Sequence, residues 1–163
     1  MRRGLVPQAA TALLAVVLIY AGTTIPDTDQ WLPLLGHRSI VTHSLLIPGL
    51  ILLRWPMVGG MLAGGFAIHL AADLLSRKWV GYALVKLPLA GSLGATGSQL
   101  FLAANVLLGL WLYHRAAAMS GAARAAWATF GAAALLYFLV NERWWLLAVP
   151  ALVLALLLAR WRR

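Results

Sequence analysis

The sequence contains no cysteine, which excludes disulfides and thiolate ligands, so any bound metal ion would be held by nitrogen and oxygen atoms. Charge is also scarce, because 10% of the 163 residues are charged, against about 25% in soluble domains. Acidic residues are the rarest of the charged ones, with 4 Asp and Glu against 13 Lys and Arg. Hydrophobic residues make up 63% of the chain and the mean hydropathy is +0.86, which predicts an integral membrane protein.

The formal net charge of +9 does not indicate a nucleic-acid partner. The Lys and Arg residues stand singly or in pairs between apolar runs, and the sequence has no basic stripe or RNA-binding signature. Such positions are typical of anchors that hold helix ends at anionic lipid headgroups. We therefore expect contacts with membrane lipids and none with nucleic acid.

Six apolar runs predict an all-α fold, a polytopic helical membrane protein with about six transmembrane helices in a single domain over residues 1–163. The first run resembles a signal peptide but lacks a good cleavage site, so we expect it to be retained as a span. The second is short and contains Pro48; we expect it to be a span, with half of a re-entrant hairpin as the alternative. The third carries Gly60 and Gly64 in a GxxxG arrangement, which favours close approach of another helix. The runs cover about 5–25, 39–53, 56–75, 99–113, 122–140 and 144–159.

The distribution of basic residues predicts the orientation of these spans. Most of the Arg and Lys residues fall on the cytoplasmic side if both chain termini lie there. We therefore expect a protein of the cell (inner) membrane whose N- and C-termini are cytoplasmic. The end of the first run, the start of the second and the end of the third then lie at the outer (periplasmic) face.

Six of the eight Asp, Glu and His residues fall in two short motifs, at the predicted ends of three spans. The segment PDTDQWLPLLGHRSIVTHS covers residues 26–44, and HLAAD covers residues 69–73. Pro26 ends the first run, because proline disfavours helical geometry at the residue before it. In HLAAD the histidine and the aspartate are four apart and share one face of a helix. All six side chains are therefore expected to meet at one membrane face: Asp27, Asp29, His37, His43, His69 and Asp73.

These six side chains predict a metal site. An ionisable group in hydrocarbon costs roughly 2.5 kcal/mol or more unless it is paired, hydrated or bound. Three histidines and three carboxylates suit a divalent metal, zinc or manganese foremost, with one ion held by three or four of them or two ions sharing all six. The remaining side chains would orient the ligands. The alternative is a metal-free, ion-paired cluster in which Asp73 pairs with Arg38 or Arg77.

The same residues resemble a known family, the YdjM-type membrane-bound metal-dependent hydrolases. The resemblance rests on PDTD at 26–29, HRSIVTHS at 37–44, HLAAD at 69–73 and GSQL at 97–100, so it covers about residues 20–105. The family is distantly similar to zinc-dependent phospholipases C and single-strand nucleases, which implies a hydrolase whose candidate metal ligands are the six side chains above. This chain has Gln30, Ser39 and Phe101 where many members have a histidine, a glycine and an acid, and Gln8 in place of a histidine in the first helix.

A hydrolase of this kind would act at the membrane interface on a lipid phosphoester. The metal would lower the pKa of water toward about 7, Asp29 or Asp27 would take the proton, and Arg38 would steady the phosphate. Lys78 and Lys86 would draw anionic headgroups toward the site. Two other functions fit the same sequence: a noncatalytic accessory subunit of a larger membrane complex, packed through its small residues, and a metal or proton transport protein. Self-association into a homo-oligomer is also left open.

Overall fold

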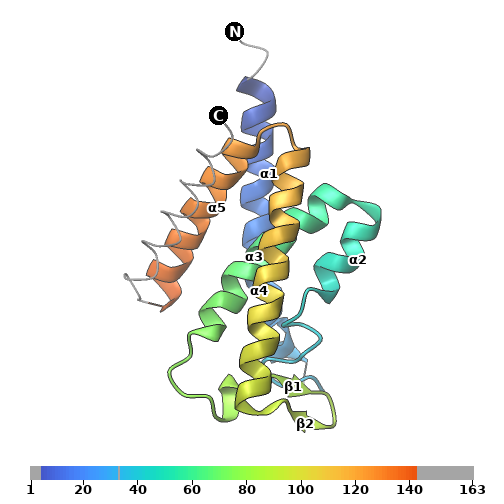
Figure 1. Ribbon diagram of the computed structural model, residues 1–163, viewed down its shortest axis with the longest axis vertical. Helices are drawn as coiled ribbons and strands as arrows, with labels where there is room; N and C mark the ends of the chain where they lie inside the picture. The colour runs from blue at the N-terminus through green and yellow to red at the C-terminus, as the bar shows by residue number, and fades with distance from the viewer. Residues whose placement is uncertain (1–4, 33, 143–163) are drawn as a thin grey trace.

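The computed structural model describes residues 5–32 and 34–142, which form a bundle of helices with a short β-hairpin toward one end (Figure 1). In chain order the elements are α1 (Leu5–Thr24), the 3-10 helix η2 (Pro26–Trp31), α2 (Leu46–Arg54), α3 (Pro56–Leu74), the 3-10 helix η3 (Gly81–Ala83), the strands β1 (Lys86–Leu87) and β2 (Gly91–Ser92), α4 (Gly94–Met119), α5 (Ala123–Tyr137) and the π-helical turn η4 (Phe138–Glu142). The mainly helical fold predicted from the sequence is confirmed.

Three helices are long and apolar enough to cross a membrane: Pro56–Leu74, Gly94–Met119, and α5 continued into η4, Ala123–Asn141. A shorter apolar helix, Gln8–Thr24, belongs to α1. These four helices match the first, third, fourth and fifth apolar runs. The sixth run, residues 144–159, lies outside the described residues, so the predicted total of six spans is not confirmed.

The second apolar run differs most from its prediction, because residues 39–45 are not helical and α2 has only 9 residues. Side chains in this segment bind the backbone groups that a helix would use. The Thr42 hydroxyl donates to the Ser39 carbonyl (3.2 Å), and the Ser44 hydroxyl accepts from the Leu46 N–H (3.2 Å). At 1.5 Å per residue α2 rises about 14 Å, whereas the hydrocarbon core of a bilayer is roughly 30 Å thick. The helix predicted to begin at about residue 39 therefore begins at Leu46, and a span formed by the second run is not confirmed.

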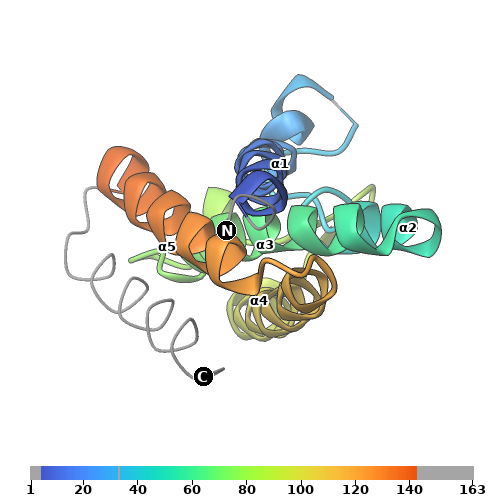
Figure 2. The same ribbon diagram turned by 90° about the horizontal axis from the view of Figure 1, so that it is seen from above.

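The centre of the bundle is α3, which is enclosed by α1, α2, α4 and α5 (Figure 2). All of residues 59–70 are buried. Glycines let the backbones meet: a β-carbon added at Gly22 of α1 would lie 2.8 Å from the α-carbon of Gly65. A β-carbon added at Gly60 would lie 2.8 Å from a backbone carbonyl oxygen of α4, and Gly64 lies against an aromatic ring of α4. The close packing predicted from the GxxxG arrangement is confirmed.

The predicted site residues gather toward one end of this bundle, where α1 and α3 end and α4 begins (lower part of Figure 1). The connection from 75 to 93 packs against the segment that contains Arg38. Lys86 of β1 donates its backbone N–H to the Arg38 carbonyl (2.8 Å) and accepts from the Ile40 N–H (2.8 Å). Backbone hydrogen bonds therefore hold this loop in place beside the helix ends.

Candidate metal centre

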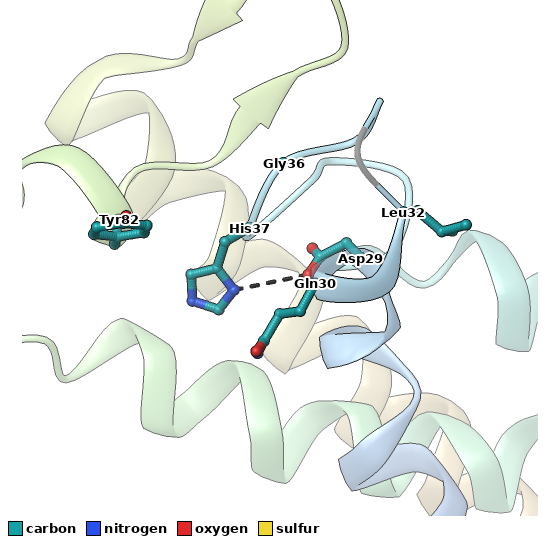
Figure 3. A pocket seen from close by; sticks show the side chains of 6 residues that line it. All are labelled: Asp29, Gln30, Leu32, Gly36, His37 and Tyr82. Atoms are coloured by element: carbon teal, nitrogen blue, oxygen red, sulfur yellow. Dashed lines mark ion pairs between the residues drawn. The ribbon is translucent and has the colours of Figure 1, made fainter.

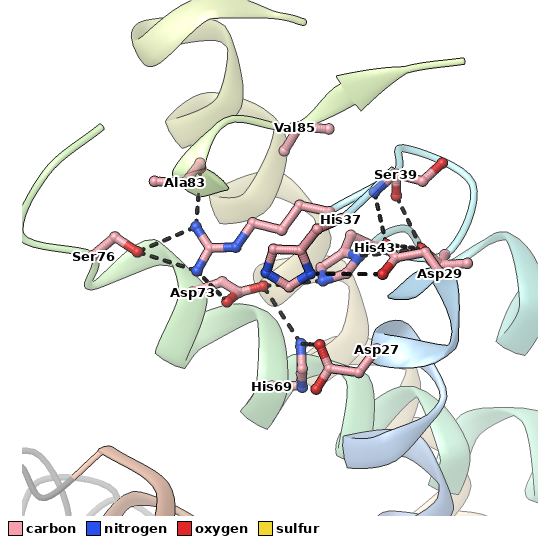
Figure 4. A network of polar contacts seen from close by, with 12 residues as sticks. Asp27, Asp29, His37, Ser39, His43, His69, Asp73, Ser76, Ala83 and Val85 are labelled. Carbon is pink, nitrogen blue, oxygen red and sulfur yellow. Dashed lines mark hydrogen bonds and ion pairs between the residues drawn. The ribbon is translucent and has the colours of Figure 1, made fainter. Parts of the chain in front are cut away.

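The structure brings all six predicted side chains into one polar cluster (Figure 4). Each of three segments supplies two of them. Asp27 and Asp29 belong to η2, His37 and His43 to the irregular segment before α2, and His69 and Asp73 to the last turns of α3. Each contacts at least one other member of the cluster. The atoms that face one another decide which of them can share an ion.

The Asp73 carboxylate and the rings of His43 and His69 form the middle of the cluster. Asp73 Oδ2 lies 3.3 Å from His43 Nε2 and 3.5 Å from His69 Nε2. All three atoms are buried, and none has a hydrogen-bond partner among the described residues. A tetrahedral ion with bonds of about 2.1 Å separates its ligand atoms by about 3.4 Å. Both distances to Asp73 Oδ2 therefore match the spacing of ligands around one ion, and neither contact has the geometry of a hydrogen bond.

The other ring nitrogen of each histidine fixes which atom carries the proton. His43 Nδ1 lies 3.1 Å from Oδ2 of Asp29, and His69 Nδ1 lies 2.9 Å from the carbonyl oxygen of Thr23. An ionised carboxylate and a carbonyl can only accept, so each Nδ1 carries the hydrogen and each neutral ring turns an unprotonated Nε2 toward Asp73. Metal-binding histidines are held in this way by a carboxylate or a backbone carbonyl. When both rings are neutral, each thus directs an electron pair toward Asp73 Oδ2.

Arg38 holds the Asp73 carboxylate from the opposite side. Its Nη2 donates to Asp73 Oδ1 (2.6 Å), which leaves Oδ2 for the two rings, and the guanidinium also donates to Ser76 and Ala83. The Arg38 backbone has a φ of 60°, a conformation that costs roughly 1–3 kcal/mol in a residue other than glycine. The ion pair expected of a metal-free cluster is therefore present. The predicted contact of Arg38 with a substrate phosphate is not supported, because its side chain is 12% exposed and already bound.

Asp29 lies behind His43 with 0% of its side chain exposed. Its Oδ2 accepts hydrogen bonds from the Ser39 N–H and the Thr42 hydroxyl, both at 2.8 Å, in addition to the contact with His43. Burial opposes ionisation of Asp29, but the bonds from His43, Ser39 and Thr42 outweigh it and keep the pKa of Asp29 below its ordinary value. Asp29 is placed to orient His43. Its enclosure argues against the predicted role of a carboxylate that takes a proton from water.

Asp27 is the most exposed carboxylate of the cluster, with 44% of its side chain accessible. Its Oδ1 lies 3.9 Å from His69 Nε2 and accepts a hydrogen bond of 3.0 Å from the Gln30 amide. One ligand atom from each of Asp27, His43 and His69 lies within 4.8 Å of the others, so this group could hold a metal ion. The Gln30 amide thus supports the exposed carboxylate of Asp27.

The charges of the cluster match a divalent cation. Three ionised carboxylates and the Arg38 guanidinium leave two negative charges uncompensated when the histidines are neutral. Without an ion, a proton on His43 would compensate part of this negative charge. Burial by itself lowers the pKa of His43, but its contacts with Asp29 and Asp73 outweigh burial and raise that pKa. This direction favours a proton on His43 between the two carboxylates when no ion is bound. One negative charge and the unpaired Nε2 of His69 remain.

His37 contacts Asp29 in a pocket of about 460 Å³ on the loop side of the cluster (Figure 3). Its Nδ1 is 3.7 Å from Asp29 Oδ1, and neither atom has a hydrogen-bond partner among the described residues. Gln30 and Tyr82 line the same pocket. His37 is therefore placed beside Asp29 and outside the group of Asp27, His43 and His69 that could share an ion.

Three residues of the cluster were not among the site residues predicted from the sequence. Thr23 supplies the carbonyl that fixes His69, and Thr42 donates its hydroxyl to Asp29. Tyr137 places its hydroxyl 3.0 Å from His69 Nδ1, although it follows His69 by 68 residues in the chain. The one sequence signal for Tyr137 is a hydroxyl-bearing ring near the end of a run of alanine and leucine.

Replacing Asp29 by asparagine tests its role as the support of His43. The amide keeps the shape of the side chain but loses the charge, and it can offer an N–H to His43 Nδ1, which would move the ring proton to Nε2. We expect the affinity for zinc to fall by about 10- to 100-fold, the usual effect of losing such a partner. Competition with a fluorescent chelator measures it, and an unchanged affinity would show that His43 is held by other contacts.

No protein-family model, curated protein or solved structure matches this chain. The resemblance to YdjM-type hydrolases therefore rests on the sequence motifs, and the evidence for a metal centre is the geometry of the cluster.

Proposed function

We propose that this protein is a divalent-metal-dependent hydrolase of the membrane interface, related to the YdjM-type hydrolases, which cleaves a phosphoester of a membrane amphiphile. The observation that carries the proposal is the convergence of unpaired donor atoms from His43, His69 and Asp73 beside the exposed carboxylate of Asp27. Buried polar atoms are normally hydrogen-bonded, so a cluster that only joined helix ends would not leave these atoms unpaired. Two imidazoles with one or two carboxylates suit zinc or manganese.

The accessibility of each side chain supports a division of roles. His43, His69 and Asp73 would hold the ion, which when bound supplies a Lewis acid that lowers the pKa of water toward about 7 and polarises a phosphoryl oxygen. Asp27 is accessible and lies beside His69, so its carboxylate can take up a proton during hydrolysis. This assignment replaces Asp29, which is enclosed.

Exposed aromatic side chains toward this end of the bundle support a location at the membrane interface. Trp31 is 81% exposed and Tyr82 is 80% exposed. Exposed Trp and Tyr are typical of the boundary between hydrocarbon and water, because their rings are apolar and their polar atoms remain hydrated. With a cytoplasmic N-terminus, as the basic residues favour, the end of α1 and this end of the protein would face the periplasm.

The proposal is tested by assaying purified protein on phosphomonoesters and phosphodiesters, both water-soluble and long-chain, with and without a chelator. We expect turnover that the chelator abolishes and that added zinc or manganese restores. Asp27→Asn should lower kcat by roughly 100- to 10,000-fold, the usual contribution of a general base, while the metal stays bound.

If no ester is hydrolysed, the metal content of the purified protein shows which part of the proposal is wrong. A wild-type protein that binds metal but hydrolyses none of the esters would contradict the hydrolase and favour the accessory subunit, which should purify together with partner proteins. A protein that binds no divalent metal would contradict the metal centre as well.

A further inference from the structure

A second feature of the fold is a cavity of about 1000 Å³ between α1 and α5. Its volume is at the upper end of the roughly 300–1,000 Å³ of small-molecule sites. Apolar side chains of both helices line most of it, including Val16 and Tyr20 of α1 and Ala133 and Leu136 of α5. We refer to it as the α1–α5 groove.

The α1–α5 groove reaches the metal centre at its polar end. Asp27 and Tyr137 both line it, and both also contact His69. Asp27 Oδ1 is 3.9 Å from His69 Nε2, and the Tyr137 hydroxyl is 3.0 Å from His69 Nδ1. A molecule that lies in the groove therefore has one end at the cluster.

The length of the groove matches one leaflet of a bilayer. From Val16 to Thr24, where α1 ends, the wall rises about 12 Å at 1.5 Å per residue, and η2 continues it to Asp27; half of a hydrocarbon core of roughly 30 Å is about 15 Å. The walls are open to lipid, because Val16 is 52%, Tyr20 71% and Leu136 63% exposed, and α5 belongs to a helix long enough to cross a membrane. Trp31, which lines the polar end, is 81% exposed and suits the headgroup level.

We propose that the α1–α5 groove holds the alkyl chain of the substrate, a long-chain amphiphile with an anionic phosphate headgroup that enters sideways from one leaflet. The headgroup assignment rests on the proposed function. None of the described residues that line the groove is basic, so a bound metal ion at its end is the group that would attract the phosphate. An apolar helix from a second copy of the chain would instead cover the exposed carboxylate of Asp27 without neutralising it.

The groove would contribute by positioning the substrate rather than by adding hydrophobic binding energy. A chain that leaves the bilayer for the groove gains little hydrophobic free energy, because lipid tails are as apolar as the side chains that line it. Its contribution is to fix the headgroup beside Asp27, which favours reaction by holding the reacting groups in register. Occupancy should therefore depend on the metal at one end and on free width along the walls.

The test uses the full-length, zinc-loaded protein in phosphatidylcholine nanodiscs and a probe that cannot be hydrolysed: hexadecylphosphonate with a photoreactive diazirine at the far end of its chain. We expect labelled peptides to come from α1 and α5 around Val16 and Ala133. Chelation of the zinc and the variant Ala132→Phe should each reduce this labelling by roughly tenfold, which corresponds to about 1.4 kcal/mol. Ala132 lines the groove and is exposed, so the larger ring can enter it.

Ala104→Phe is the matched control, because Ala104 is an exposed alanine of α4, which does not line the groove. It should leave labelling unchanged. Metal content is measured in each variant to show that the fold is intact, and Leu136→Trp replaces Ala132→Phe if that protein loses its metal. The proposal would be overturned if α4 were labelled as strongly as α1 and α5. It would also be overturned if the substitution that fills the groove left labelling unchanged. The probe reports binding alone, because it cannot be hydrolysed. Labelling in the groove by a protein that hydrolyses none of the tested esters would therefore reject the proposed function and leave the groove as a binding site for amphiphiles.

Discussion

Replacing His69 or Asp73 by alanine is expected to empty the metal centre, from about one ion per chain to almost none. Each supplies one of three buried donor atoms that lack a hydrogen-bond partner, and a typical open zinc site has three protein ligands. Asp27 is a weaker replacement, because it is 44% exposed and already accepts a hydrogen bond from Gln30. The loss of affinity should exceed the roughly 10- to 100-fold that follows the loss of an orienting partner. Asp73→Ala has a further effect, because it leaves the Arg38 guanidinium without its anion beside the site.

Elemental analysis after dialysis against a weak chelator measures this result. Asp73→Asn keeps the size of the side chain and should also lose the metal while the helical circular dichroism is retained. His114→Ala is the control, since His114 lies on α4 against Trp127 and outside the cluster. Wild-type metal content in both His69→Ala and Asp73→Ala would exclude the arrangement proposed here.

Replacing Gly65 by leucine is expected to disrupt the bundle. A β-carbon at this position would lie 2.7 Å from the α-carbon of Gly22, so the backbones of α1 and α3 would have to separate. Ordinary overpacking costs roughly 1–3 kcal/mol, and here the obstacle is a backbone that no side-chain rearrangement can relieve. The same displacement would separate Asp27 from His69, because η2 directly follows α1. Lower thermal stability and loss of metal should therefore appear together.

Thermal unfolding in detergent, followed by circular dichroism and size-exclusion chromatography, checks this expectation. Gly49→Leu in α2 is the matched control, because a β-carbon there meets nothing within 4 Å. Its cost should be about that of an ordinary surface substitution, within about 0.5 kcal/mol. Equal destabilisation by the two substitutions would show that the close approach of α1 and α3 does not limit stability.

The convergence of the site was predictable because it depends on where helices end. Pro26 stops α1 just before two carboxylates, and the i, i+4 spacing of His69 and Asp73 puts both on one face of α3. Alternating helix directions then bring these ends together without detailed knowledge of packing. For the same reason, the cluster could be named although no span count is confirmed.

The division of roles within the cluster was not predictable. Asp29 and Asp73 are chemically identical, and only their surroundings make one accept bonds from Ser39 and Thr42 while the other is held by Arg38. Contacts of this kind join residues that are distant in the chain and carry no periodic signal. The non-helical segment 39–45 was predicted wrongly for another reason: its apolar residues resemble a helix, whereas its Ser and Thr side chains compete for the backbone groups that a helix needs.

If the cluster holds a divalent ion as proposed, its two uncompensated negative charges would link the lifetime of the protein to the supply of that ion. A ligand that binds only the folded chain raises stability by about 4 kcal/mol at a thousandfold excess over its dissociation constant. Chains made while the ion is scarce would open more often around the ends of α1 and α3, and proteases remove opened chains. The cellular abundance of the protein should then follow metal availability even when its rate of synthesis is constant.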